Sequence, residues 1–433
     1  MDYPLFLVPY VGGSWLIGSI AIFHVIIAHF AIGGGLLMVA TEQLAARRDD
    51  TLWLTFVRKH SVFLVLLSTV LGALSGVGIW FTIGLVHPAA VASLIHTFVW
   101  GWAIEWVFFV VEIAAALLYV GTWDRVSRKT HLAIGWIYFV AAYLSLVIIN
   151  GIVTFMLTPG LWLETRAFWD GFFNPTYWPS LVLRTGIALM LADAYGWLVA
   201  TRLPRDNERA ALVRYLALWG VAGVSVAGAG FAWWAANIPA EARALIFPAD
   251  SLLRSTYVVG LVALGLLAVL LVSVGFLAPR SFGAAAALLA VLFTGTYFGA
   301  YERVREGGRK PYIIHGYMYS NGIRVDEVDR LNREGVLTKA RWAGAGLAAD
   351  LAAGLASLGQ RVFRAQCQMC HSLDGYLAIR PLVAGQDAEG LTAFLEALRA
   401  GRPGMPPIVG TEKEIQGLAA YLASLGETAG GVK

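Results

Sequence analysis

Residues 14–41 read SWLIGSIAIFHVIIAHFAIGGGLLMVAT and contain no Asp, Glu, Lys or Arg. A run of about 20 apolar residues is long enough to cross a bilayer as a helix, and this run is longer. The whole chain of 433 residues is 58% hydrophobic and 14% charged, with a mean hydropathy of +0.68. This composition is typical of an all-α membrane protein with many spans.

Seven further segments meet the same criterion. With the first, the predicted spans are about 14–41, 60–86, 92–121, 132–157, 179–200, 211–236, 252–277 and 284–302. The first residues, MDYPLFLVPYVGGSW, lack the charged start and the small-residue cleavage site of a signal peptide, so we expect the first span to be retained. The sequence therefore predicts a bundle of about eight transmembrane helices.

Arg and Lys residues gather in every second connection, beginning with the one after the first span. Basic connections stay in the cytoplasm, so the N-terminus and everything after residue 302 are expected in the periplasm of a bacterial inner membrane protein. The pI near 9.0 follows from these connections. The basic charge thus reflects lipid bilayer topology, and we expect no nucleic-acid partner.

Both cysteines of the chain lie in Cys367-Gln368-Met369-Cys370-His371. C-x-x-C-H is the attachment pattern of a c-type haem: the thiols form thioethers to the vinyl groups, and the histidine binds the iron. A redox or zinc pair is the alternative, but zinc needs further thiol or imidazole ligands, and none follows His371. The expected covalent cofactor is haem c.

Met405 is the expected second iron ligand, in a proline-stiffened loop 34 residues after His371. A thioether opposite a histidine raises the potential of a haem. The last part of the chain resembles a small class I cytochrome c, whose haem is attached outside the cytoplasm, in agreement with the topology. We therefore expect a haem-binding transmembrane domain, a periplasmic connector and a cytochrome c domain. Their predicted ranges are 1–302, 303–355 and 356–433.

His24 and His29 lie inside the first span. An ionisable side chain there costs roughly 2.5–3.5 kcal/mol on insertion scales, so each is a functional candidate. Five residues separate the two imidazoles by about 140° around the helix. They are therefore expected to serve two haems, or a haem and a proton path; the alternative for either is a buried, hydrogen-bonded histidine.

Glu105 and Glu112 lie on one face of the third span, about 10.5 Å apart along the helix axis. This spacing suits a proton relay, or a haem neighbour followed by a relay. The alternative is that each carboxyl pairs with a polar group of another helix.

Several short motifs follow one another along the membrane part. They are Ile22-Phe-His24, Ala31-Ile-Gly-Gly-Gly35, Ala103-Ile-Glu105, Glu112, Gly121-Thr-Trp-Asp-Arg125 and Gly308-Arg-Lys-Pro-Tyr312. In this order they resemble subunit I of the cytochrome bd oxidases over about residues 10–315.

The resemblance implies one or two b- or d-type haems in the membrane part. It implies that His24 is a haem ligand, that Glu105 and Glu112 are the inner carboxylates of the catalytic region, and that Arg309 is the motif arginine. The family's eighth-helix haem-ligating glutamate corresponds to either Glu302 or Glu306: Glu306 keeps the spacing to the motif arginine, whereas Glu302 lies closer to the membrane.

The sequence also departs from this family. Arg184 stands where the family has a haem-ligating histidine, and Thr256 stands where it has the partner methionine if Arg254 is the aligned arginine. Neither is a suitable haem ligand. The family's long quinol-binding connection is reduced to Asn237–Ser251, and His29 is absent from the family pattern.

The favoured interpretation is a bd-like terminal oxidase subunit of the respiratory chain. Electrons enter through the fused cytochrome c and reduce oxygen, or another small oxidant, at a membrane haem. The alternative is an electron-transfer subunit that links a partner oxidoreductase or a quinone pool to periplasmic cytochromes c. A structural anchor is the third option. The resemblance implies a second bd-type membrane subunit, and a cytochrome c is the expected donor.

Overall fold

The computed structural model describes residues 5–6, 8–204, 207–340, 342 and 354–429. Within these residues, eight helices are long and apolar enough to cross a membrane, which confirms the prediction of an all-α bundle. They are α1 (Gly13–Arg48), α2 (Thr51–Leu66) continued through a π-helical segment (Leu67–Gly72) into α3 (Ala73–Val86), α5 (Val99–Gly121), α6 (Arg128–Phe155), α9 (Tyr177–Ala200), α10 (Asn207–Asn237), α12 (Leu252–Leu270) with a π-helical end (Leu271–Leu277), and α13 (Ala284–Gly308).

Shorter elements lie between and after these helices. They are α4 (Pro88–Thr97), α7 (Trp162–Thr165), α8 (Phe168–Phe172), α11 (Ala240–Ile246), β1 (Tyr312–Ile314), β2 (Met318–Tyr319), α14 (Val328–Glu334), α16 (Leu355–Gln366), α17 (Arg380–Val383), α18 (Ala388–Ala397) and α19 (Glu412–Ala429), with 3-10 turns at Pro279–Ser281, Val325–Glu327, Val336–Thr338 and Leu398–Ala400.

Several helices extend beyond their predicted ends, and two differences have a clear local cause. The second span begins at Thr51, because the Asp50 side chain accepts a hydrogen bond from the Trp53 amide (3.0 Å) and caps the helix. The third predicted span is broken at Phe98, whose φ of −120° and ψ of 33° separate α4 from α5. The apolar run continues through this residue, so hydropathy alone does not reveal the break.

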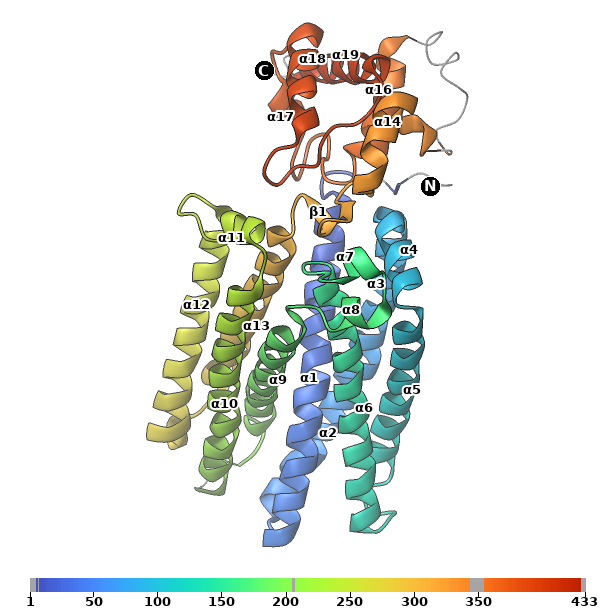
Figure 1. Cartoon of the computed structure of the whole chain (residues 1–433). Coiled ribbons are helices and arrows are strands. Elements are labelled where there is room, and N and C mark those ends of the chain that lie inside the picture. Colours follow the sequence, from blue (N-terminus) through green and yellow to red (C-terminus); the bar gives the residue numbers. More distant parts are fainter. Residues whose placement is uncertain (1–4, 7, 205–206, 341, 343–353, 430–433) are drawn as a thin grey trace. The chain divides into compact units, whose positions relative to one another are not determined.

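The chain divides into two compact units. The first comprises Met1–Ile20, Gly78–Thr97 and Arg309–Lys433, and the second comprises Ala21–Val77 and Phe98–Gly308. In the second unit α5 packs on α6, α9 on α10 and α12 on α13 (Figure 1). This unit is the helical bundle that holds most of the ionisable residues of the spans.

The glycine triplet of the first span lets α1 approach three other helices. A Cβ at Gly33 would lie 1.8 Å from the Ala188 carbonyl oxygen of α9, and one at Gly35 would lie 2.3 Å from the Tyr138 ring of α6. A Cβ at Gly34 would lie 2.9 Å from Leu64 of α2. Small residues allow such close contact between membrane helices. The three glycines therefore let α1 pack closely against α9, α2 and α6.

The first unit contains the C-terminal helices and the β1–β2 hairpin. Its buried core is lined by Leu331, Val362, Phe363, Leu391, Ile415 and Leu418. The Glu414 carboxylate accepts hydrogen bonds from the backbone amides of Val336 (2.9 Å) and Leu337 (3.0 Å), which ties α19 to the connector. The start of the chain belongs to the same unit, because Ser14 Oγ donates to the Met369 carbonyl (3.1 Å) and the Tyr376 amide donates to the Tyr10 carbonyl (2.6 Å).

Candidate functional site

The C-x-x-C-H motif forms a helical turn directly after α16. The amides of Cys370 and His371 both donate to the Cys367 carbonyl, at 3.1 and 3.0 Å. His371 Nδ1 lies 2.9 Å from the Leu377 carbonyl oxygen, which can only accept, so Nδ1 carries the proton. Nε2 then keeps its lone pair for a metal, the arrangement in which a second partner orients a metal-binding histidine.

The surroundings of the motif are apolar. Cys367 and Met405 both pack against the core of the C-terminal helices. Burial, with a smaller contribution from Cys370, raises the pKa of the Cys367 thiol to about 12. Two thiols, an oriented imidazole and a thioether around one apolar core fit a covalently attached haem.

His24 of α1 faces the end of the π-helical segment between α2 and α3. Its Nδ1 lies 3.2 Å from the Gly72 carbonyl oxygen and 3.1 Å from Ser75 Oγ. The carbonyl accepts the Nδ1 proton, so Nε2 keeps its lone pair. A Cβ at Gly76 would come 3.1 Å from the imidazole, so the neighbouring glycine makes room for the ring. The imidazole is thus oriented with Nε2 available to a haem iron.

His29 has a different environment. Its Nδ1 donates to the Val25 carbonyl (2.8 Å), and its Nε2 accepts from Arg184 Nη1 (3.3 Å). Arg184 also donates from Nη2 to Glu302 Oε1 (2.6 Å), and Glu302 Oε2 accepts from Arg305 Nη2 (3.0 Å). All four side chains are largely buried. We call these four residues the arginine cluster.

A line of polar side chains follows the contact between α5 and α6. Glu105, Glu112 and Tyr119 recur every seven residues along α5, and Ser145, Tyr138 and His131 recur with the same spacing along α6. Ser145 Oγ donates to Glu105 Oε1 (3.0 Å), and the Tyr119 and His131 rings lie 4.1 Å apart. Tyr138 interacts electrostatically with Glu112, while its hydroxyl donates to the Ala31 carbonyl of α1 (3.0 Å). We call these three pairs the α5–α6 ladder.

Glu42 of α1 closes one end of this ladder. Its Oε2 accepts from the Tyr119 hydroxyl (2.6 Å), and its Oε1 lies 2.9 Å from His131 Nδ1. His131 Nε2 lies 2.9 Å from the Tyr119 carbonyl, and all three side chains are buried. The sequence analysis predicted only Glu105 and Glu112 of this line; the seven-residue spacing on both helices was the signal that would have revealed the others.

Two further predicted residues lie near the end of α13. Glu306 interacts electrostatically with Arg305. Arg309 is buried, and its carbonyl oxygen accepts from the Tyr312 amide (2.9 Å) where the chain leaves the helix for β1. A functional role of Glu306 and of Arg309 stays a prediction.

Comparisons with known proteins match both parts of the chain. Residues 14–236 match the family model "Cytochrome bd terminal oxidase subunit I", and residues 354–422 match "Cytochrome C oxidase, cbb3-type, subunit III". Among solved structures, the bd oxidase from Geobacillus thermodenitrificans has a similar fold, with a TM-score of 0.60 at 16% identity, over 81% of this chain and 97% of that chain. No curated protein matches the sequence.

Proposed function

The chain belongs to the cytochrome bd terminal oxidase subunit I family and carries a C-terminal cytochrome c domain; from this we propose that it is an oxidase subunit in which haem c supplies electrons to a membrane haem. The resemblance expected from the sequence is confirmed for both parts. The chain is thus a subunit of a membrane haem oxidoreductase. We propose oxygen as the acceptor.

The observation that carries this proposal is the matching arrangement of two histidines. In His371 and in His24, Nδ1 donates to a backbone carbonyl, and Nε2 is left as a lone-pair donor. One histidine follows the thioether motif and the other lies inside a span. This arrangement supports two iron ligands in one chain, His371 for an electron donor and His24 for an acceptor.

Bound haem would supply one-electron transfer and a place for a small oxidant. The protein's own contribution is the delivery of protons. In the α5–α6 ladder, hydroxyl, imidazole and carboxyl groups follow one another along two helices, and such groups can pass protons. Successive pairs are about 10.5 Å apart along the helix axis, so the proposed path needs water molecules between them. We propose that protons enter at Glu42 and His131 and reach Glu112 and Glu105.

The basic connections support an orientation with the cytochrome c domain in the periplasm and Glu42 toward the cytoplasm of a bacterial inner membrane. A soluble or membrane cytochrome c would then reduce the fused domain. A second bd-type membrane subunit is the proposed partner, because the solved relative is a bd oxidase. The short connection Asn237–Ser251, with α11 inside it, supports cytochrome c rather than quinol as the donor.

Oxygen uptake by the purified complex tests this function. Uptake driven by reduced cytochrome c and abolished by His24→Leu is the expected result, with carbon monoxide binding to the reduced membrane haem. Uptake with quinol alone would contradict the proposed route. Membrane haems that are all six-coordinate and bind no carbon monoxide would favour an electron-transfer subunit instead.

A further inference from the structure

We infer that the arginine cluster takes the place of a membrane haem, so that His29, Arg184, Glu302 and Arg305 bind one another and none of them ligates iron. The inference rests on the proposed function, because it concerns how many haems the membrane part holds. It starts from Arg184, which stands where the related oxidases have a haem-ligating histidine.

Both oxygens of Glu302 are already used. Arg184 Nη2 lies 2.6 Å from Oε1, and Arg305 donates to Oε2 from Nη2 (3.0 Å) and Nε (3.2 Å). The carboxylate is buried, and so are both guanidinium groups. Breaking a buried ion pair leaves an uncompensated charge, which is strongly destabilising. Iron at Glu302 would have to share a carboxylate that already accepts three hydrogen bonds, and it would lie beside two buried arginine charges.

His29 also lacks a free ring nitrogen. Its Nδ1 is held by its own helix, and its Nε2 accepts from Arg184 Nη1 at 3.3 Å. His24 differs from His29 in its hydrogen bonds. In the part of the chain that the structure describes, only Nδ1 of His24 has a hydrogen-bond partner. Two histidines five residues apart on one helix therefore have different roles.

The arginine is itself fixed by its neighbours. Arg184 Nε donates to Ser180 Oγ (3.3 Å), and the guanidinium lies 5.7 Å from the centre of the Tyr301 ring. Ser180 Oγ lies 3.4 Å from the Tyr301 hydroxyl. Arg184 thus joins α1, α9 and α13 through side-chain contacts that need no cofactor.

The helices around the cluster leave little room. A Cβ at Gly186 of α9 would lie 2.3 Å from the Ala227 amide of α10, so these two helices touch through their backbones. Thr256 stands at the position of the family's ligating methionine if Arg254 is the aligned arginine, and it donates its hydroxyl to the Leu252 carbonyl of its own helix (3.1 Å). Neither Arg184 nor Thr256 offers a suitable ligand atom for haem iron.

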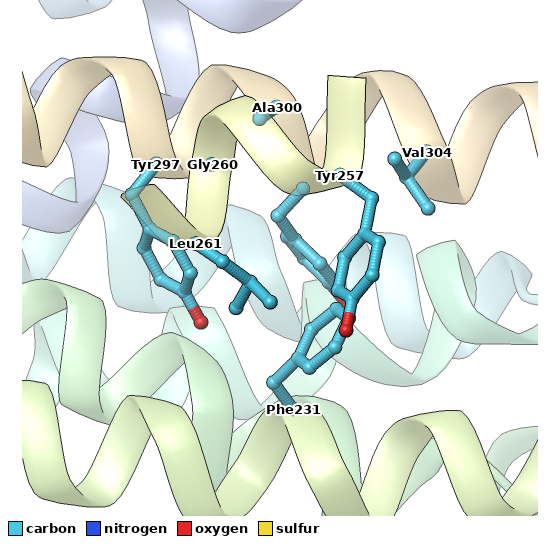
Figure 2. A pocket seen from close by; sticks show the side chains of 8 residues that line it. Phe231, Tyr257, Gly260, Leu261, Tyr297, Ala300 and Val304 are labelled. Atoms are coloured by element: carbon cyan, nitrogen blue, oxygen red, sulfur yellow. The ribbon is translucent and has the colours of Figure 1, made fainter. Parts of the chain in front are cut away.

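Figure 2 shows how aromatic rings fill the space between α10, α12 and α13. Phe231 and Tyr257 stack with their ring centres 5.5 Å apart, and Tyr297 lies nearby. The pocket they line holds about 10 Å³, room for about one water molecule. Ligand pockets of cofactor size hold roughly 300–1,000 Å³.

The number of haems per protein molecule tests the inference. Covalently bound haem c serves as the measure of the amount of protein. The pyridine haemochrome spectrum gives the ratio of non-covalent to covalent haem for the wild type, H29Q, E302Q and H24L. We expect the wild-type ratio in H29Q and E302Q, and a lower ratio in H24L. A lower ratio in H29Q or E302Q overturns the inference. A wild-type protein without non-covalent haem overturns the proposed function instead.

The recovery of stability in a double variant provides a second readout, because the loss of a haem ligand would not be compensated by removing Arg184. E302Q leaves the buried Arg184 charge unpaired and is expected to lower Tm. R184M/E302Q removes that charge while the introduced amide oxygen still accepts from Arg305, so Tm is expected to recover in part. Additive losses in the double variant would mean that the two side chains do not act as a pair, and would contradict the cluster.

Discussion

Ser145 donates a hydrogen bond to Glu105, with 3.0 Å between Oγ and Oε1, across the contact of α6 with α5. This bond orients a carboxyl group inside a membrane span. Seven residues further along α5, Glu112 has Tyr138 of α6 as its neighbour instead. The two glutamates therefore differ in their partners, although the sequence presents them as a matched pair.

Glu112→Gln is expected to lower oxygen uptake about a hundredfold, because the amide cannot carry a proton along the ladder. Oxygen consumption with reduced cytochrome c measures the effect, and reduction of haem c by the donor should be unchanged. Glu164→Gln on the exposed α7 is the matched control. Wild-type uptake in Glu112→Gln would remove this residue from the proton path.

Ser145→Ala is expected to lower oxygen uptake less than Glu112→Gln, by roughly threefold to tenfold, because a single hydrogen bond contributes about 0.5–1.5 kcal/mol. The same uptake assay checks it. An equal loss in both variants would mean that Ser145 itself carries protons. Ser225→Ala is a suitable control, since that exposed hydroxyl donates only to the Val221 carbonyl of its own helix.

His131→Leu is expected to destabilise the protein by about 1.5–3 kcal/mol, because the buried Glu42 carboxylate loses a hydrogen-bond partner. Tyr119→Phe removes one hydrogen bond to that carboxylate and is expected to cost about 1.5–3 kcal/mol. Denaturation in detergent measures both. His96→Ala is the control, since this exposed imidazole only binds the Ala92 carbonyl of its own helix.

Met405→Ala is expected to lower the midpoint potential of haem c by roughly 0.1–0.3 V, within the ≈ 0.8 V range that axial ligands set. A spectroscopic redox titration measures the potential. The thioethers at Cys367 and Cys370 are left intact, so the haem c content should not change. An unchanged potential would show that another group is the second ligand.

Gly230→Ala is expected to destabilise the bundle by about 1–3 kcal/mol, because its Cβ would lie 2.4 Å from the Leu183 amide nitrogen in α9. Gly228→Ala on the same helix is the matched control: no heavy atom of the part of the chain that the structure describes lies within 4 Å of its Cβ. That change should be neutral or stabilising, since alanine favours helices. Equal thermal denaturation midpoints of the two variants would contradict the backbone contact.

Hydropathy predicted the spans because each needs a continuous apolar run, and all eight are present. It missed the break at Phe98, because the residues on both sides of it are apolar. The cytochrome c domain was also predicted from the sequence, because the C-x-x-C-H pattern consists of residues that are neighbours in the chain.

The partners of the buried charged residues could not be predicted from the sequence. Arg184 and Glu302 are separated by 118 residues, and Glu42 and His131 by 89. Such pairs follow from which helices are neighbours, and hydropathy carries no information about neighbours. The sequence therefore predicted that Arg184 is no haem ligand, but not that it binds His29 and Glu302.

The raised pKa of Cys367 also constrains the assembly of the protein. The thiolate is the reactive form of cysteine, and a thiol with a pKa of about 12 is almost entirely protonated at neutral pH. Ser14 meanwhile binds the carbonyl of Met369, between the two cysteines. We therefore expect haem attachment to Cys367 and Cys370 to precede the packing of the N-terminal segment against the motif.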